Sequence, residues 1–193
     1  MGIIGKDFKY IAVKNFIDDS VIKILETYTN MNHRLNLRPY PQDHEMNNYE
    51  TGIYGDRLME SIMLNKQSHV EKITGKKLLP TYSYWRMYTN LGTLPKHHDR
   101  ESCEISVSFN IATKGEDWPI YMDGNPVYTK PGDAVIYLGA KIKHYRKEFK
   151  GDYSSQCFLH YVDKDGPYTD FAKDKRAYYG LNKKNHLNVK INI

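Results

Sequence analysis

The chain has 193 residues, of which 40% are hydrophobic and 13% aromatic, a composition that excludes a wholly disordered chain. Its length suits one domain with a single core, and we take residues 1–193 as that domain. The net charge of +5 is modest, and the sequence has no apolar run long enough for a membrane-spanning helix.

The two cysteines, Cys103 and Cys157, lie in apolar runs and form no CxxC pair, so we expect reduced residues of the core. The first residues lack the charged-then-apolar layout of a signal peptide. We therefore expect a cytoplasmic protein that has no membrane partner.

Residues 1–78 predict helical support for the fold. Lys9–Val13 could form a short strand, and Asp18 to Ser20 could cap a helix. Apolar residues follow that cap at helical spacing, namely Val21, Ile22, Ile24, Leu25 and Tyr28. Residues 32–50 are polar and predict an exposed loop. A second helix is predicted over Tyr54–Ile73, with Gly75 ending it.

From Leu79 the pattern changes to alternating apolar residues, which predicts strands. The predicted strands are Thr81–Tyr88, Cys103–Ile111, Trp118–Met122, Val127–Tyr128, Ala134–Leu138, Lys143–Phe149 and Gln156–Val162. Glycine-containing turns separate them at 123–125, 131–133 and 150–152. This order predicts an α+β domain. Its core would be a double-stranded β-helix (jelly-roll) barrel at 79–163, with the N-terminal helices packed on one sheet and a basic tail at 164–193.

Three residues have the spacing of a metal site. His97 and Asp99 are two positions apart, so on an extended segment their side chains point to the same face. His144 follows at the start of a later predicted strand. Two imidazoles and one carboxylate occupy one face of an octahedral metal, which suits non-haem Fe(II) and leaves positions vacant for other ligands. His98 is the competing ligand, but adjacent residues of an extended strand cannot both face one metal.

Several segments in this order together resemble the 2-oxoglutarate- and Fe(II)-dependent oxygenases, in particular small phage and marine members of the prolyl-4-hydroxylase-like branch. These segments are 88–92, 95–99, 105–111, 131–134, His144 and 158–162. The resemblance covers residues 80–163 and extends loosely to the helical half. It implies a hydroxylase that couples 2-oxoglutarate decarboxylation to hydroxylation of a substrate C–H bond. His97, Asp99 and His144 would be the Fe(II) ligands, O₂ a co-substrate and ascorbate a possible reductant.

The chain departs from the family where the C5 carboxylate of 2-oxoglutarate should bind. The family usually has Lys or Arg nine or ten residues after the distal histidine, but those positions here are Tyr153 and Ser154. Arg146 lies two residues after His144 and should point the same way into the barrel. We expect Arg146 to bind this carboxylate because a guanidinium can pair with both of its oxygens, and Lys150 is the alternative.

Further candidates surround this site. Tyr88 is at the position where related enzymes offer a tyrosine hydroxyl to the same carboxylate. His160 could orient the co-substrate or a water molecule, or could be an ordinary core histidine. Arg100 and Glu104 could line the entrance or form a surface pair, and Trp85 is a further candidate. The resemblance implies a prolyl substrate, whereas the residues leave a protein, a peptide or a small molecule open.

Two other functions fit parts of the pattern. A cupin-type metal enzyme would need HxH followed by Glu, but this chain has His97-His98 and Glu104. A non-catalytic barrel could bind nucleic acid through its tyrosines and its basic tail. In that tail Asp174 stands among six basic residues, namely Lys173, Lys175, Arg176, Lys183, Lys184 and Lys190. A solvated surface is the simpler interpretation of this tail.

Overall fold

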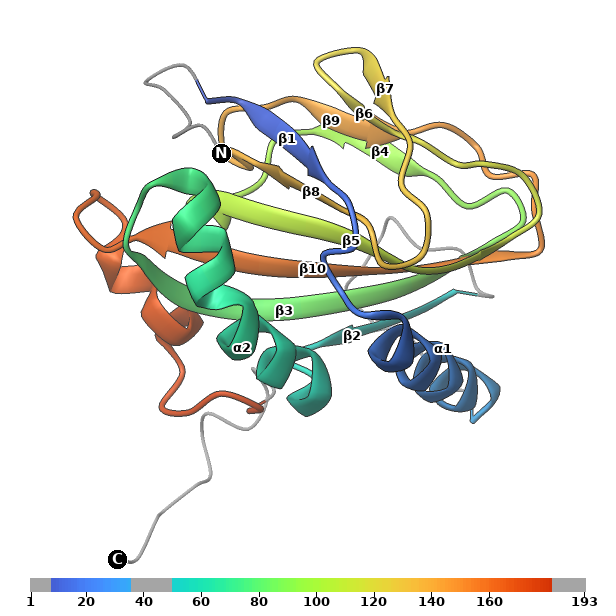
Figure 1. Ribbon diagram of the computed structural model, residues 1–193, viewed down its shortest axis with the longest axis horizontal. Helices are drawn as coiled ribbons and strands as arrows, with labels where there is room; N and C mark the ends of the chain where they lie inside the picture. The colour runs from blue at the N-terminus through green and yellow to red at the C-terminus, as the bar shows by residue number, and fades with distance from the viewer. Residues whose placement is uncertain (1–7, 36–49, 182–193) are drawn as a thin grey trace, which may run out of the picture.

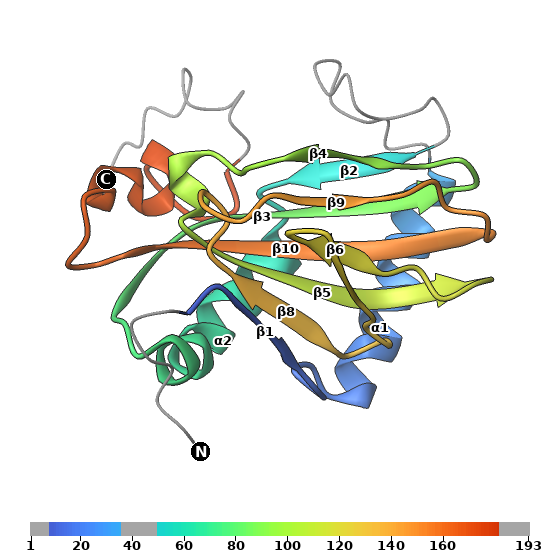
Figure 2. The same ribbon diagram turned by 90° about the horizontal axis from the view of Figure 1, so that it is seen from above.

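Two antiparallel β-sheets form the centre of the computed structural model, which describes residues 8–35 and 50–181 (Figures 1 and 2). The six-stranded sheet has the order β1 (Tyr10–Val13), β8 (Ala134–Tyr137), β5 (Ile105–Lys114), β10 (Tyr153–Asp163), β3 (Leu78–Thr89), β2 (Thr51–Tyr54). The four-stranded sheet has the order β4 (Leu94–His97), β9 (His144–Arg146), β6 (Ile120–Met122), β7 (Asn125–Val127). The sheets pack together where Ile120 and Met122 meet Val135 and Tyr137.

The helices α1 (Asp19–Arg34) and α2 (Arg57–Thr74) pack on the other face of the six-stranded sheet (Figure 1). Asp56 caps α2, because its carboxylate accepts hydrogen bonds from the backbone N–H groups of Leu58 and Met59. Gly75 ends α2 with a φ of 70°, which a residue without a Cβ adopts at little cost. In the described part of the chain no helix combines the length and the apolar character of a membrane span.

The N-terminal half differs from the sequence prediction in three places. The second helix does not begin at Tyr54, because Thr51–Tyr54 pair with β3 as strand β2 and the cap at Asp56 fixes the helix start. The first helix continues to Arg34, into the loop predicted at 32–50. Glu50, at the end of that predicted loop, is buried. Residues 36–49 of the loop lie outside the described residues.

The two faces of the six-stranded sheet have opposite character, because successive side chains of a strand alternate between faces. The face beneath the helices is apolar and includes Trp85, Met87, Val107, Phe109, Cys157 and Leu159. The face toward the smaller sheet carries buried polar side chains, including Arg86, Ser106, Ser108, Asn110, Gln156 and His160. The larger apolar core therefore lies on the helix side, and the space between the sheets combines smaller apolar clusters with buried polar side chains.

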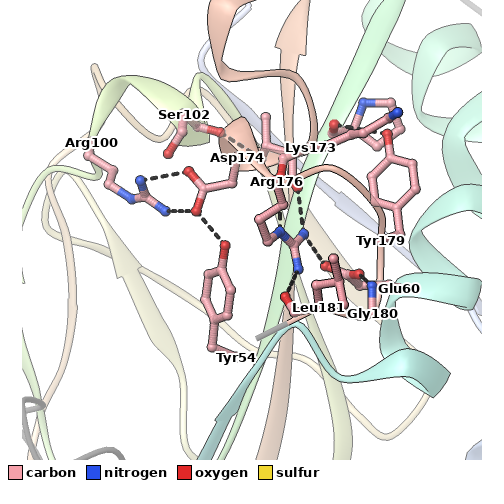
Figure 3. A network of polar contacts seen from close by, with 12 residues as sticks. Tyr54, Glu60, Arg100, Ser102, Lys173, Asp174, Arg176, Tyr179, Gly180 and Leu181 are labelled. Atoms are coloured by element: carbon pink, nitrogen blue, oxygen red, sulfur yellow. Dashed lines mark hydrogen bonds and ion pairs between the residues drawn. The ribbon is translucent and has the colours of Figure 1, made fainter. Parts of the chain in front are cut away.

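The described part of the C-terminal segment is anchored to the fold through Asp174 and Arg176, whereas Lys173 and Lys175 are exposed in agreement with a solvated surface. After β10, the short helix η2 (Thr169–Lys175) is followed by Arg176, whose buried guanidinium pairs with Glu60 of α2 (Figure 3). Asp174 accepts two hydrogen bonds from Arg100. Of the predicted basic residues, Lys183, Lys184 and Lys190 lie outside the described residues.

Candidate metal centre

The structure brings His97, Asp99 and His144 together. Strands β4 and β9 pair antiparallel with His97 directly opposite His144, and Asp99 follows two residues after His97. Oδ1 of Asp99 lies 3.4 Å from Nε2 of His97 and 3.3 Å from Nε2 of His144. One ligand atom from each residue lies within 4.8 Å of the others, so the three could bind one metal ion.

Backbone carbonyls orient both imidazoles. Nδ1 of His97 lies 2.7 Å from the carbonyl oxygen of Pro95, and Nδ1 of His144 lies 3.0 Å from that of Ile142. A carbonyl can only accept, so each Nδ1 donates, and Nε2 is the nitrogen that can offer a lone pair to a metal once it has lost its proton. His98 is exposed, in agreement with the expectation that one of the adjacent histidines faces the site.

Asp99 is held by two groups that the sequence analysis did not single out. Its Oδ2 accepts a hydrogen bond from Ser106 at 2.9 Å, and its backbone N–H donates to Gly139 at 3.0 Å. Burial would raise the pKa of Asp99, but hydrogen bonds with His144 and His97 bring this pKa below its ordinary value. Asp99 is therefore a carboxylate at neutral pH, the form in which it can bind a metal.

A second possible donor group overlaps the first one. Asp99, Cys103 and His160 also have one ligand atom each within 4.8 Å of the others. Burial, with Asp99 nearby, raises the pKa of Cys103 to about 12, so this residue carries a neutral thiol. A metal takes the thiolate rather than the thiol, so binding at Cys103 would first require loss of this proton, and His97, Asp99 and His144 are the more suitable candidate metal centre.

Arg146 is a buried cation close to this centre in the sequence. It lies on β9 two residues after His144, and it is 2% exposed. Its guanidinium donates to the carbonyl of Trp118 at 2.6 Å and to Oε1 of Gln156 at 3.0 Å. Nε has no hydrogen-bond partner, and no carboxylate pairs with Arg146, among residues 8–35 and 50–181. Burial lowers the pKa of Arg146 to about 10.

Arg86, the other buried arginine of the inner face, provides the contrast. Its guanidinium lies 2.6 Å from a carboxylate oxygen of Glu50, and both side chains are buried. Burial would lower the pKa of Arg86, but Tyr88 and Glu50 raise it above its ordinary value. Arg86 is thus already paired with a carboxylate, whereas Arg146 has no carboxylate partner in the described part of the chain and could receive an anionic ligand.

The remaining predicted co-substrate residues are placed as follows. Tyr88 is buried on β3, and its ring meets that of Trp118 with centroids 4.8 Å apart. The guanidinium of Arg146 lies 4.9 Å from the centroid of the Trp118 ring, so Trp118 links Tyr88 to Arg146. His160 faces inward, and burial lowers its pKa to about 4. Lys150 is exposed in the turn between β9 and β10, so its position does not support it as the alternative to Arg146.

The other candidates have structural partners. Trp85 is buried on the helix side of the sheet, and its Nε1 lies 3.4 Å from Asp56, so it does not face the metal centre. Arg100 and Glu104 do not form the pair that the sequence allowed. Arg100 forms a bidentate ion pair with Asp174 at 2.8 and 2.9 Å (Figure 3). Glu104 accepts a hydrogen bond from the backbone N–H of Asp163.

No protein-family model matches the sequence, and no curated protein matches it significantly. The fold does match solved structures. SnoK, a non-haem carbocyclase from nogalamycin biosynthesis that depends on 2-oxoglutarate, has a TM-score of 0.67 and 11% identity, covering 83% of this chain and 81% of its own. A Pseudomonas putida prolyl-4-hydroxylase has a TM-score of 0.64 and 10% identity, and the match covers 82% of this chain and 94% of the prolyl-4-hydroxylase. HygX from Streptomyces hygroscopicus, solved with nickel and 2-oxoglutarate bound, has a TM-score of 0.63 and 8% identity. The match covers 86% of this chain and 90% of HygX. The chain therefore has the fold of 2-oxoglutarate-dependent oxygenases.

Proposed function

We propose that the protein is a 2-oxoglutarate- and Fe(II)-dependent oxygenase that hydroxylates its substrate. The observation that carries this proposal is the presence of His144 and Arg146 on one short strand. Two residues of a strand span roughly 7 Å, comparable to the length of a five-carbon dicarboxylate. A metal at His144 and a cation at Arg146 would then receive the two ends of 2-oxoglutarate.

The strand order supports the finer description of the fold. We interpret β3 to β10 as a jelly-roll barrel within a single domain of residues 1–193, because the strands divide between the two sheets as that fold requires. Strands β3, β5, β8 and β10 belong to one sheet, and β4, β6, β7 and β9 belong to the other. A ligand held between the sheets would be shielded from water on both sides.

Each residue has a separate role in this proposal. His97, His144 and Asp99 hold Fe(II), and Arg146 binds the C5 carboxylate of 2-oxoglutarate through its free N–H groups. The carbonyl of Trp118 and the side chain of Gln156 hold the guanidinium in place. Tyr88 and His160 are the additional co-substrate candidates.

With O₂, the bound Fe(II) and 2-oxoglutarate would supply an oxidation that yields succinate, CO₂ and a hydroxylated substrate carbon. One oxygen atom of O₂ would enter the succinate, the other would enter the new hydroxyl, and the CO₂ would come from the C1 carboxylate of 2-oxoglutarate. The protein contributes the ligand geometry and the buried polar side chains between the sheets. One compared structure is a prolyl-4-hydroxylase, so a prolyl residue in a peptide is the first substrate to test. A small molecule is the alternative, and ascorbate is a candidate reductant.

The proposal is tested by succinate release from 2-oxoglutarate in the purified protein. Release should require both Fe(II) and O₂ and should proceed slowly without a prime substrate. His144→Ala should abolish it, whereas His98→Ala is the matched control, because His98 is exposed beside the site. Stoichiometric iron with neither 2-oxoglutarate binding nor succinate release would favour a cupin-type enzyme instead.

A further inference from the structure

Ser106 is a fully buried hydroxyl at the centre of a hydrogen-bond chain. Its Oγ lies 2.9 Å from Oδ2 of Asp99, 2.9 Å from Nδ1 of His160 and 3.2 Å from the carbonyl oxygen of Cys103. Ser106 and His160 come from neighbouring strands, β5 and β10, where they are register partners. Both residues are buried, at 0% and 5% exposure.

The chemistry of these groups fixes the direction of the chain. A carboxylate can only accept, so the hydroxyl proton of Ser106 is donated to Asp99. The hydroxyl oxygen is then left to accept from Nδ1–H of His160. The ring of His160 is itself packed against that of Tyr82, with centroids 4.5 Å apart. The hydrogen-bond chain therefore runs from His160 through Ser106 to Asp99, and the more distant Cys103 carbonyl is a competing acceptor for the same hydroxyl proton.

In this hydrogen-bond chain the two carboxylate oxygens of Asp99 have different partners. Oδ2 is engaged by Ser106, while Oδ1 lies against the Nε2 atoms of His97 and His144. Gly139 packs directly on this arrangement. A Cβ at position 139 would collide with Oδ2 of Asp99, with Oγ of Ser106 and with the carbonyl of Cys103. A side chain at position 139 would therefore displace Asp99 or Ser106 from this arrangement.

We propose that Ser106, held by His160, is a positioning residue that limits Asp99 to a single metal-binding oxygen. Three protein ligands of an octahedral metal leave three positions, and 2-oxoglutarate with O₂ needs all three. A carboxylate that bound through both oxygens would take one of them. This inference rests on the proposed function. In it, the hydrogen bond from Ser106 to Asp99 keeps one metal coordination position open for O₂.

The test uses nitric oxide, an unreactive surrogate for O₂, and compares Ser106→Ala with Ser108→Ala under anaerobic conditions. Ser108 is the matched control because it lies two residues further on the same face of β5, is 2% exposed and has no hydrogen-bond partner for its hydroxyl in the described part of the chain. Fe(II) and 2-oxoglutarate affinities are measured first, and then the electron paramagnetic resonance signal of the nitrosyl complex is titrated.

We expect Ser106→Ala to retain Fe(II) and 2-oxoglutarate but to bind nitric oxide about 10- to 100-fold more weakly than the wild type, a range taken from the losses of metal affinity or activity that follow removal of outer-shell partners. Ser108→Ala should match the wild type. Unchanged nitric oxide affinity in Ser106→Ala would overturn the inference. Loss of Fe(II) itself would also overturn it, because Ser106 would then be needed for the ion rather than for the binding mode of Asp99.

If Ser106→Ala does not fold, Ser106→Cys keeps the size of the side chain and replaces the hydroxyl with a weak donor, and the same outcomes apply. A wild-type protein that fails to bind Fe(II) and 2-oxoglutarate would refute the proposed function. A wild type that binds both, with a Ser106→Ala variant that behaves identically toward nitric oxide, would refute this inference alone.

Discussion

Replacing Arg146 with methionine separates the role of this residue in ligand binding from its role in the fold. Burial lowers the pKa of Arg146 from 12.5 to about 10, which corresponds to about 3 kcal/mol of unfavourable charge burial without a ligand. Methionine removes this cost but leaves the acceptors on Trp118 and Gln156 without a donor, at about 1–3 kcal/mol each. These effects oppose each other, so the free energy of unfolding of the ligand-free protein should lie between about 1 kcal/mol above and about 3 kcal/mol below that of the wild type.

The affinity for 2-oxoglutarate should respond far more strongly. Truncating one partner of a buried charge pair costs about 2–5 kcal/mol, which is roughly a 30- to 4,000-fold loss of affinity. Metal binding should persist because His97, Asp99 and His144 are unchanged. The assay is an anaerobic titration of the metal-loaded variant with 2-oxoglutarate, together with urea unfolding of the ligand-free protein.

Arg86→Met is the matched control. It removes the buried guanidinium that pairs with Glu50, and breaking such a pair costs about 3–5 kcal/mol of stability. The 2-oxoglutarate affinity of the folded control should stay near that of the wild type. The reasoning is refuted if Arg146→Met binds 2-oxoglutarate as tightly as the wild type, or if it loses as much stability as Arg86→Met.

Three further predictions concern the metal centre. His144→Ala should abolish stoichiometric metal binding in a titration whereas His98→Ala should spare it, and the reverse result would show that the ligands are assigned wrongly. Gly139→Ala should weaken metal affinity by about tenfold or more, because the new Cβ collides with Asp99; a wild-type titration curve would contradict this. Burial lowers the pKa of His160 from 6.5 to about 4, so between these pH values the imidazole is protonated in the unfolded state but not in the folded state. The free energy of unfolding should therefore fall as the pH decreases from 6.5 to about 4. His160→Gln should reduce this slope in urea unfolding by up to about 1.4 kcal/mol per pH unit, and an unchanged slope would exclude the effect.

The candidate ligands could be predicted because their grouping depends on the alternation of side chains along a single extended segment. Residues two apart on an extended segment share a face, which is enough to group His97 with Asp99 and Arg146 with His144. Ser106 and Gly139 were missed because their contacts with Asp99 join segments that are distant in the sequence. A signal for Ser106 existed in the polar residues that alternate with apolar ones along its strand.

The parts of the fold that were predicted wrongly depend on long-range contacts. Strand β2 is four residues long and is an edge strand that pairs with β3, so its sequence shows little pattern of its own. In the C-terminal segment, Lys173, Asp174 and Lys175 all have positive φ, a conformation that costs residues with a Cβ roughly 1–2 kcal/mol each. The ion pair between Asp174 and Arg100 helps to hold this turn, and no local propensity predicts it.

The central claim is tested most directly by adding Fe(II) and 2-oxoglutarate to the wild-type protein without O₂ and recording the visible spectrum. The account predicts a weak metal-to-ligand charge-transfer band that requires both additions, saturates at one Fe(II) per chain and disappears when O₂ is admitted as succinate forms. A protein that binds Fe(II) stoichiometrically but develops no band at saturating 2-oxoglutarate would contradict it.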